Sequence, residues 1–454
     1  MQTVRRLKWL AFRGLEQASI VKDGLKSSLG NKGHSEASES ARVSLRPPSI
    51  SDAPPLYWFF VSTIGELNAI RPLLQQLLDE QPLADLLFIS DHEHYREPYL
   101  RQYPRAEFVS TTGLSADLRY LFARRMPSSL VVAEIPARLS DAPCRFPYAA
   151  LHYAKQHKVP LALVNGWLYG GGPSCAIDNL ERRFFDRDYA ELFDLSLVQT
   201  KEVESELLEQ GAVNVHITGN MKFDQALVWA NQQHTLAGIP AELAADRAPL
   251  IVVGSVSEAV DQKKLLQALI SLRSQQPNAR MVIAPRHPEF PERMAKLRGV
   301  LEESGLRFCF RTELAVSDDA NASNIDWDVM ALNTVGELAG YYAAADIAHV
   351  GVDHNVLEPL ALGKPVTIDP GWEPKYPSYP VYDQLRDFPF LMECDGDVAL
   401  AEQWTDWLAN NQSSHAVGES VVESLSEFAG ALDRNWALLK QAGFFAVPAA
   451  AKSS

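Results

Sequence analysis

The chain has 454 residues, of which 46% are hydrophobic and 22% charged, and its formal net charge at pH 7 is -15. This length favours two domains over one core, and the acidic balance argues against general nucleic-acid binding, which requires a basic surface. The cysteines are far apart and form no CxxC pair, which argues against a zinc site and favours unpaired core thiols in a reducing compartment. They are Cys144, Cys175, Cys309 and Cys394.

The first residues mix cations with apolar side chains at helical spacing. The cations are Arg5, Arg6, Lys8 and Arg13, and the apolar residues are Val4, Leu7, Trp9, Leu10, Phe12 and Leu15. This pattern predicts a helix lying on an anionic membrane surface. A helix docked on the protein body is the alternative, and Glu16 and Asp23 argue against a cleaved transit peptide. The segment 30–55 is rich in Ser, Gly and Pro and predicts a flexible linker, so residues 1–55 form the first region. No run of about 18 apolar residues occurs, so the sequence predicts no membrane-spanning helix.

Beyond residue 56, short apolar runs alternate with helical patterns such as 66–78 and 148–156. Strands are predicted at 57–61, 86–89, 130–133, 161–165, 195–199 and 215–218, and after Asp224 at 250–253, 281–284, 308–310, 329–332, 347–350 and 366–368. This βαβ rhythm predicts an α/β fold of two Rossmann-like domains with mostly parallel sheets. We expect the domains at 56–235 and 236–445, with a hinge at 240–249. One or two terminal helices are expected over 403–439, and they could cross back to the first domain.

Residues 351–359, with the sequence Gly-Val-Asp-His-Asn-Val-Leu-Glu-Pro, follow one predicted strand and open a helix predicted at 356–362. Asn355 occupies the expected N-cap position, and Glu358 falls three residues later, where a capping box places an acid. A helix N-terminus at this edge of a sheet can bind phosphate, and the carboxylate could accept sugar hydroxyls. A capped helix without a ligand is the alternative.

Four further motifs lie close after predicted strands, where open α/β sheets bind ligands. They are Ser-Thr-Ile-Gly-Glu-Leu at 62–67, Gly-Asn-Met-Lys-Phe-Asp at 219–224, Pro-Arg-His-Pro-Glu at 285–289 and Leu-Asn-Thr-Val-Gly-Glu-Leu at 332–338.

In this order and spacing the five motifs resemble those of the Kdo transferases (3-deoxy-D-manno-octulosonic acid transferases), which are GT-B glycosyltransferases. The resemblance covers about 57–370. It implies two Rossmann-like domains facing a central cleft, the first binding the acceptor and the second the nucleotide-sugar donor. It also implies inverting transfer of Kdo from CMP-Kdo to a lipid A precursor in lipopolysaccharide biosynthesis. The enzyme would lie peripherally on the cytoplasmic face of the bacterial inner membrane.

The resemblance also implies roles for single residues. Glu66 matches the general base, and we expect it to be partly exposed and mostly ionised at neutral pH. Arg286 would bind the CMP phosphate through its guanidinium. The full set of donor-binding positions is Ser255, Pro285, Arg286, His287, Val335, Gly336, Glu337, Asn355 and Glu358. The acceptor side or cleft would carry Gly65, Glu134 and Lys222. A surface Arg-His-Pro turn at 286–288 paired with Glu289, and a salt bridge between Lys222 and Asp224, are the structural alternatives.

Three departures mark a divergent member. The loop Gly351-Val352-Asp353 carries an acid where the family has Gly, and this acid would repel an anionic sugar unless it pairs with a cation. Val256-Ser257 replaces a Thr-His pair after Ser255, and Trp167 replaces an Arg. These changes leave open another donor sugar or acceptor.

No DxD motif or His-rich cluster suggests a metal site, so no metal or other cofactor is expected. One alternative function is a GT-B transferase or sugar-nucleotide epimerase with another donor, although a second acid/base pair is not evident. The other is a catalytically degenerate, membrane-associated relative, against which Glu66, Arg286 and Glu358 together argue.

Overall fold

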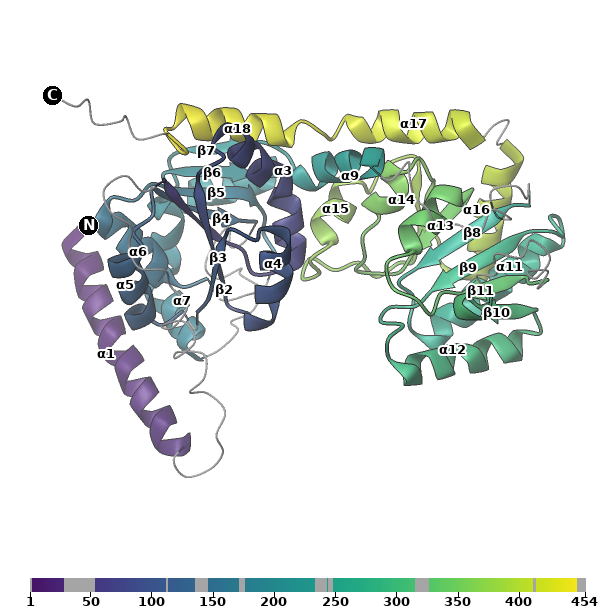
Figure 1. Ribbon diagram of the computed structural model, residues 1–454, viewed down its shortest axis with the longest axis horizontal. Helices are drawn as coiled ribbons and strands as arrows, with labels where there is room; N and C mark the ends of the chain where they lie inside the picture. The colour runs from purple at the N-terminus through teal and green to yellow at the C-terminus, as the bar shows by residue number, and fades with distance from the viewer. Residues whose placement is uncertain are drawn as a thin grey trace. The chain divides into compact units, whose positions relative to one another are not determined.

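The computed structural model describes residues 2–27, 54–111, 113–134, 146–170, 176–232, 243, 248–314, 326–410 and 414–446. It divides into two compact units (Figure 1). Unit 1 comprises Met1–Gln225 and Ala429–Ser454, and unit 2 comprises Ala226–Phe428. The division between the units falls earlier in the chain than the expected 235/236 boundary, and the last helix belongs to unit 1. Most of the linker expected at 30–55 and of the hinge expected at 240–249 lies outside the described residues.

Unit 1 contains a seven-stranded sheet in the order β3-β2-β1-β4-β5-β6-β7. Every neighbouring pair is parallel, which confirms the predicted α/β class. Its strands are β1 Leu56–Phe60, β2 Asp85–Ser90, β3 Glu107–Ser110, β4 Ser129–Ala133, β5 Leu161–Gly166, β6 Leu195–Val198 and β7 Val215–Ile217. The helices are α1 Gln2–Ser27, α3 Ile64–Glu80, η1 Glu93–Tyr95, α4 Arg96–Gln102, α5 Ser115–Arg124, α6 Tyr148–His157, α7 Ala176–Tyr189, η3 Ala190–Leu192, α8 Lys201–Glu209, α9 Met221–Gln232, which crosses the division, and α18 Ala431–Gln441.

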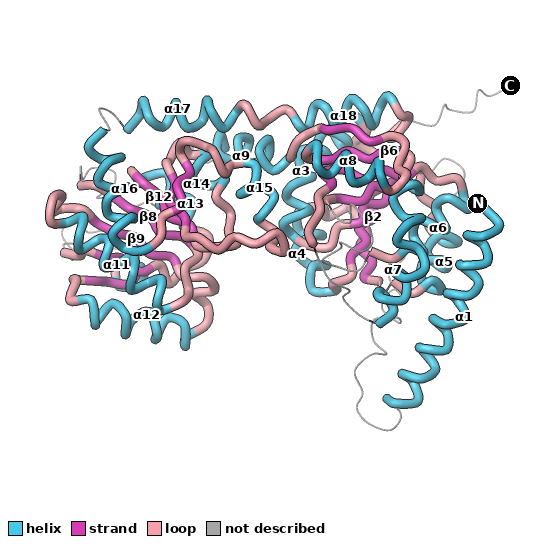
Figure 2. Tube along the Cα trace, turned by 180° about the vertical axis from the view of Figure 1, so that it is seen from behind, coloured by secondary structure: helices cyan, strands magenta, loops and turns pink. Residues whose placement is uncertain are grey.

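The central strand β1 is buried on both faces, which is why it reads as an uninterrupted apolar run. Tyr57 and Phe59 point into a core formed with α3 and α18, which includes Leu74. Trp58 faces the other side and lies against Phe122 of α5, with ring centroids 4.6 Å apart. Helices therefore cover both faces of the sheet, as Figure 2 shows.

Unit 2 repeats this architecture with a parallel sheet in the order β10-β11-β9-β8-β12-β13-β14. Its strands are β8 Leu250–Gly254, β9 Arg280–Ala284, β10 Phe308–Phe310, β11 Val329–Ala331, β12 Ile347–Val350, β13 Val366–Ile368 and β14 Leu391–Glu393. The helices are α11 Ala259–Arg273, α12 Pro291–Ser304, η5 Arg311–Glu313, α13 Leu338–Ala344, α14 Leu357–Ala361, α15 Tyr379–Gln384, α16 Gly396–Asn410 and α17 Ser414–Ser426. Cys309 and Cys394 are buried and unpaired in this unit, whereas Cys144 and Cys175 lie outside the described residues.

The C-terminal region forms three helices, α16, α17 and α18, where one or two were predicted. Gly430, with φ of 86°, separates the last two, because a residue in the left-handed conformation ends helical geometry. The Asp224 carboxylate accepts hydrogen bonds from the N–H groups of Gly430 and Ala431 at 2.7 and 3.1 Å. This contact fastens the start of α18 to the start of α9.

The N-terminal helix α1 is docked on unit 1 beside α7. Trp9 and Phe12 are buried, Trp9 stacks on His152 of α6 with ring centroids 4.0 Å apart, and Lys8 Nζ lies 2.6 Å from the Asp188 carboxylate. The face of α1 that carries Trp9 and Phe12 is therefore docked on the protein body, which was the alternative to membrane binding. The opposite face of α1 is exposed. Within the described ranges, no helix combines the length and apolarity needed to cross a bilayer.

Candidate functional site

The topology of unit 1 places two carboxylates at one point. Strands β1 and β4 are neighbours, yet the chain continues from β1 toward β2 and β3 on one side and from β4 toward β5 on the other. The carboxyl ends of two such strands form the crevice in which open α/β sheets bind ligands. Glu66 opens α3 shortly after β1, and Glu134 directly follows β4. Both predicted residues therefore lie at this switch point.

Glu66 is held in a buried position by the first turn of α3. The Thr63 hydroxyl caps the helix by accepting from Glu66 N–H at 3.2 Å, while the Ser62 N–H donates to Glu66 Oε2 at 2.6 Å. Glu66 is only 4% exposed, so the expectation of a partly exposed side chain is wrong.

The same burial changes the acidity of Glu66. Loss of water, reinforced by the nearby charge of Glu134, raises the pKa of Glu66 well above its ordinary value. Asp91, beyond the end of β2, adds to this rise, and the positive charge of Lys222 opposes it. Burial thus raises the pKa of Glu66 against the opposing effect of the Ser62 hydrogen bond.

Glu134 forms an ion pair with Lys222 of α9, with Lys222 Nζ 2.5 Å from Glu134 Oε1. Glu134 is 2% exposed, and burying a carboxylate this deeply requires a partner. Asp224 instead caps α18, so the suggested salt bridge between Lys222 and Asp224 is absent. The pre-hinge motif thus supplies the counter-ion of the second switch-point carboxylate.

The end of β5 adds residues that were not predicted as part of the site. Asn165 accepts from Met221 N–H through its side chain at 2.9 Å and so fastens β5 to the start of α9. Trp167 is buried, and its backbone N–H donates to the Glu134 carbonyl at 3.2 Å. The position of Asn165 at a strand end was the available signal, as it was for Asp91 beyond β2.

In unit 2 the switch point lies between β8 and β12, which are neighbours in the sheet. Ser255 follows β8 and Gly351 follows β12, and Gly351 N–H donates to the Gly254 carbonyl at 3.1 Å. A Cβ atom at Gly351 would stand 2.8 Å from the Ser255 carbonyl oxygen, and one at Gly254 would stand 1.8 Å from the Tyr342 hydroxyl. Gly351 is therefore needed for the close approach of these loops, and Gly254 leaves room for the Tyr342 side chain of α13.

Arg286 and His287 project from the loop after β9. Both are exposed, whereas Pro285 is buried. His287 Nδ1 lies 3.0 Å from Glu289 Oε1, so the alternative of a turn paired with Glu289 is present, through His287. Among the described side chains, no carboxylate forms an ion pair with Arg286. Its guanidinium is available for an anionic ligand.

His354, which was not predicted, links this loop to the one after β12. Burial, together with the positive charge of Arg286, lowers the pKa of His354 to about 4, although Asp353 opposes the shift. Asp353 accepts from the Ser378 hydroxyl at 2.6 Å. The expected repulsion by Asp353 is thus moderated by a hydrogen bond rather than by a cation.

The predicted cap at Asn355 and Glu358 forms only in part. Helix α14 spans only Leu357–Ala361, and its cap residue is Val356, which adopts a helical φ of -73°. Asn355 Oδ1 accepts from Leu357 N–H at 3.1 Å, and its amide donates to Glu358 Oε1 at 3.2 Å. Five residues make too short a helix for a strong N-terminal dipole. Burial raises the pKa of Glu358, and burial, with the charge of Glu358, raises the pKa of Tyr342.

Val335, Gly336 and Glu337 follow a strand that does not itself border the switch point of unit 2. They follow β11, which is separated from β12 by β9 and β8. Glu337 Oε1 lies 3.3 Å from Arg311 Nη2, so this carboxylate already has a cationic partner. Ser255, Arg286 and Glu358 thus follow adjacent strands, and the Gly336 turn leads into α13, whose Leu338 lies close to Gly254 at the end of β8.

Backbone strain is concentrated at these strand ends. Five non-glycine residues with positive φ lie just beyond or at the end of a parallel strand. They are Glu134, Asn165, Ser255, His287 and Asp353. Such conformations cost about 1–3 kcal/mol each and cluster at functional sites. As for metals, no group of three or more His, Cys, Asp or Glu among the residues described could hold an ion.

Known proteins resemble this chain over most of its length. It is 24% identical over 412 residues to the 3-deoxy-D-manno-octulosonic acid transferase of Chlamydia trachomatis serovar A, with 88% of each chain covered. The protein of the same name from Bordetella pertussis is 28% identical over 367 residues, covering 72% of this chain and 74% of the relative. No family model matches the sequence.

Among solved structures, the UDP-GlcNAc 2-epimerase of Neisseria meningitidis, bound to UDP-GlcNAc, superimposes with a TM-score of 0.58. It covers 85% of this chain and all 100% of its own length at 14% identity. This likeness confirms the GT-B-like fold of two Rossmann-like domains and shows the fold alone.

Proposed function

Because the chain is a glycosyltransferase and a divergent member of the Kdo transferase family, we propose that it transfers Kdo, or a related sugar, from CMP-Kdo to a lipid A precursor in lipopolysaccharide biosynthesis. The relatives' shared name supports the sugar. The observation that carries the proposal is the placement of chemically suited side chains at the switch points of both sheets. These are Glu66 and Glu134 in unit 1, and Ser255, Arg286 and Glu358 in unit 2.

We assign Glu66 as the general base for the acceptor hydroxyl. A base works best when its pKa lies near the operating pH, because it must then both take and release a proton readily. Burial and the charge of Glu134 move Glu66 in this direction. The ion pair of Glu134 with Lys222 keeps that second charge in place. Glu134 and Lys222 are therefore positioning residues, while Glu66 contacts the acceptor.

We assign donor binding to unit 2. Arg286 has an exposed guanidinium suited to bidentate contact with the phosphate of CMP. His354, with its pKa near 4, is uncharged at neutral pH and can hydrogen-bond the donor without adding charge. Glu358 can accept a sugar hydroxyl. We further propose that transfer inverts the anomeric centre and needs no metal ion, so chelator should leave the rate unchanged.

We propose that the protein works peripherally at the cytoplasmic face of the inner membrane. Helix α1 exposes Leu7 by 63% and Leu10 by 59%, and Val4 and Leu15 lie on the same face. Arg5, near the start of the helix, pairs with Glu191, just before β6, and Glu16, about midway along the helix, accepts from Ser115 N–H at 3.0 Å, at the start of α5. The helix thus runs from the amino edge of the sheet toward the carboxyl edge that carries Glu66. A bilayer against α1 would bring a lipid acceptor to the flank of this edge.

The deciding experiment incubates the full-length protein with CMP-Kdo and tetraacylated lipid A precursor and follows both by mass spectrometry. A mass gain of one Kdo per acceptor with release of CMP is expected, and NMR of the product should show the inverted anomer. A parallel reaction with UDP-GlcNAc tests the epimerase alternative. Epimerisation of UDP-GlcNAc without transfer from CMP-Kdo would overturn the proposal.

A further inference from the structure

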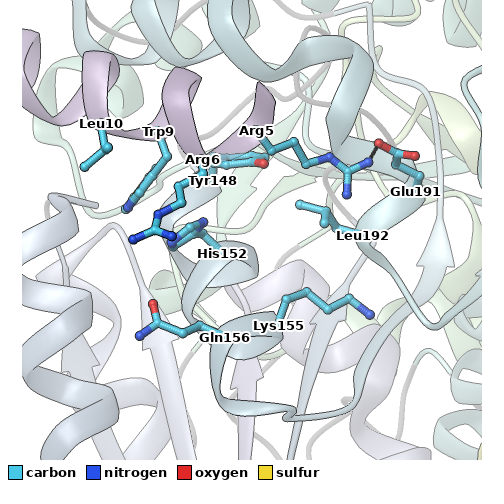
Figure 3. A pocket seen from close by; sticks show the side chains of 10 residues that line it. All are labelled: Arg5, Arg6, Trp9, Leu10, Tyr148, His152, Lys155, Gln156, Glu191 and Leu192. Carbon is cyan, nitrogen blue, oxygen red and sulfur yellow. Dashed lines mark ion pairs between the residues drawn. The ribbon is translucent and has the colours of Figure 1, made fainter. Parts of the chain in front are cut away.

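A pocket of about 700 Å³ lies on unit 1 beneath the start of α1 (Figure 3). It is lined by Arg5, Arg6, Trp9, Leu10, Tyr148, His152, Lys155, Gln156, Glu191 and Leu192. Helix α6 runs antiparallel to the strands, so its second half lies toward the amino edge of the sheet, and η3 directly precedes β6. The pocket is therefore at the opposite edge from Glu66 and forms no part of the candidate active site.

The pocket gathers cations on an otherwise acidic chain. Arg6 is exposed and extends toward His152 in Figure 3, and no carboxylate of the described residues forms an ion pair with it. Lys155 Nζ lies 2.5 Å from Asp194 Oδ1 but keeps 34% of its side chain exposed. Arg5 neutralises Glu191, the only carboxylate in the lining. Arg6 therefore faces the pocket with no ion-pair partner among the described residues. Lys155 pairs with Asp194, which is not part of the lining, and its side chain stays partly exposed.

An uncharged aromatic wall completes the polar part of the pocket. His152 stacks on Trp9, and burial, with the charge of Arg13, lowers the pKa of His152 to about 4. His152 is consequently neutral at pH 7 and can donate or accept a hydrogen bond. The wall therefore suits a ligand that carries both a negative charge and hydrogen-bonding oxygens.

The cationic pocket is continuous with the exposed apolar face of α1. Leu10 lines the pocket and is itself mostly exposed, and Leu7 and Val4 follow on the same helix face. An amphiphile could set its acyl chains against these residues while its phosphate meets Arg6, whose planar guanidinium matches phosphate oxygens. We propose that this pocket binds the phosphate headgroup of a bilayer phospholipid. The inference rests on the membrane association proposed above and gives it a defined site, remote from the acceptor site.

The test uses the full-length protein and dihexanoyl phosphatidylglycerol below its micelle concentration, measured by isothermal titration calorimetry. Saturable binding is expected. Arg6→Gln and Lys155→Gln should each weaken it about fivefold, the usual effect of one cation at a lipid phosphate. Arg119→Gln is the matched control, because Arg119 is an exposed cation of α5 on the same flank, close to Tyr153, and outside the pocket lining. It should leave the affinity unchanged.

Two further probes separate the sources of the phosphate and the two proposals. Inorganic phosphate should bind at least tenfold more weakly than the lipid, because it cannot contact Leu10. Equal affinity for both, unchanged lipid affinity in Arg6→Gln, or an equal loss in Arg119→Gln would each overturn the pocket. Arg6→Lys, which keeps the charge but loses the bidentate geometry, should be intermediate if the pocket is correct. Wild-type protein that sediments with anionic vesicles while Arg6→Gln does so equally would refute the headgroup site alone, whereas no sedimentation of wild type would refute membrane association itself.

Discussion

Lys222 of α9 and Glu134 beyond β4 form an ion pair, with Nζ and Oε1 2.5 Å apart, at the edge of the sheet that also carries Glu66. The lysine is 18% exposed and the glutamate 2%. Glu134 is also strained, with φ of 62°. A buried carboxylate in a costly backbone conformation beside a second carboxylate is expected at a functional site rather than as a stabilising feature.

Lys222→Met should destabilise the protein, because it leaves the Glu134 charge buried without a partner. Breaking a buried pair usually costs 3–5 kcal/mol, and the partial exposure of Lys222 reduces the expected loss to about 2–3 kcal/mol. Adding Glu134→Gln should recover most of this loss, as a double-mutant cycle from urea unfolding would show. Lys201→Met, at an exposed position of α8, serves as the control. Full stability of the single variant would mean that the pair contributes nothing.

Glu66→Gln keeps the shape and hydrogen bonds of the side chain but removes its ability to take a proton. We expect kcat to fall by about 10²–10⁴, the usual contribution of a general base, while CMP binding is unchanged. Single-turnover assays with CMP-Kdo and acceptor, together with CMP titration, measure the two quantities. A variant that turns over near the parent rate would remove Glu66 from the base role and make Glu134 the next candidate.

The same substitution should change how stability depends on pH. Burial, and then the charge of Glu134, raises the pKa of Glu66 in the folded protein, so the folded state holds this proton more tightly than the unfolded chain. The resulting stabilisation is complete below the ordinary Glu pKa and is lost as pH rises through the raised value. The Gln variant lacks this loss.

The stability of Glu66→Gln relative to the parent protein, measured as the difference in free energy of unfolding, should therefore be greater at pH 8 than at pH 4.5. Urea unfolding at both values measures this difference, with Glu97→Gln, an exposed acid of α4, as the control. A difference that does not change with pH would show that Glu66 keeps an ordinary pKa.

Arg286→Ala should weaken CMP binding by about 1.5–3 kcal/mol, the range for a hydrogen bond to a charged group. The fold should be unaffected because the side chain is exposed. Calorimetric titration with CMP checks the affinity. Arg298→Ala is a suitable control, since this arginine of α12 pairs with Glu313 on the surface at 3.2 Å. Equal CMP affinity in both variants would exclude Arg286 from the donor site.

Replacing Leu7 and Leu15 together by Ser should reduce binding to anionic vesicles without loosening α1, which is anchored through Trp9 and Phe12. Each apolar side chain withdrawn from a bilayer loses about 1.5–3 kcal/mol of burial. Vesicle sedimentation at low and high salt measures the binding, with Leu83→Ser, an exposed leucine outside α1, as the control. Undiminished sedimentation would argue against α1 as the membrane-binding face. A concentration-dependent dimer lost in the variant would show that the face contacts a second copy instead.

Local sequence determined which segments form the central strands. Strands buried on both faces must be apolar throughout, so β1 and β8 can be predicted from the sequence without any tertiary information. The strands that were missed, β3 and β14, lie at the outer edges of their sheets. An edge strand is covered less completely and tolerates polar residues such as Glu107 and Glu393, which weakens its pattern.

The positions of Glu66, Ser255 and Arg286 after strands were also readable from the chain, because a parallel sheet places all such positions at one edge. Their environments were not. The partner of Lys222, the burial of Glu66 and the nearness of His354 to Arg286 depend on strand order, which brings together residues far apart in the sequence. Charge and pKa at a site are set by these long-range contacts and by lost water, so only the tertiary structure decided them.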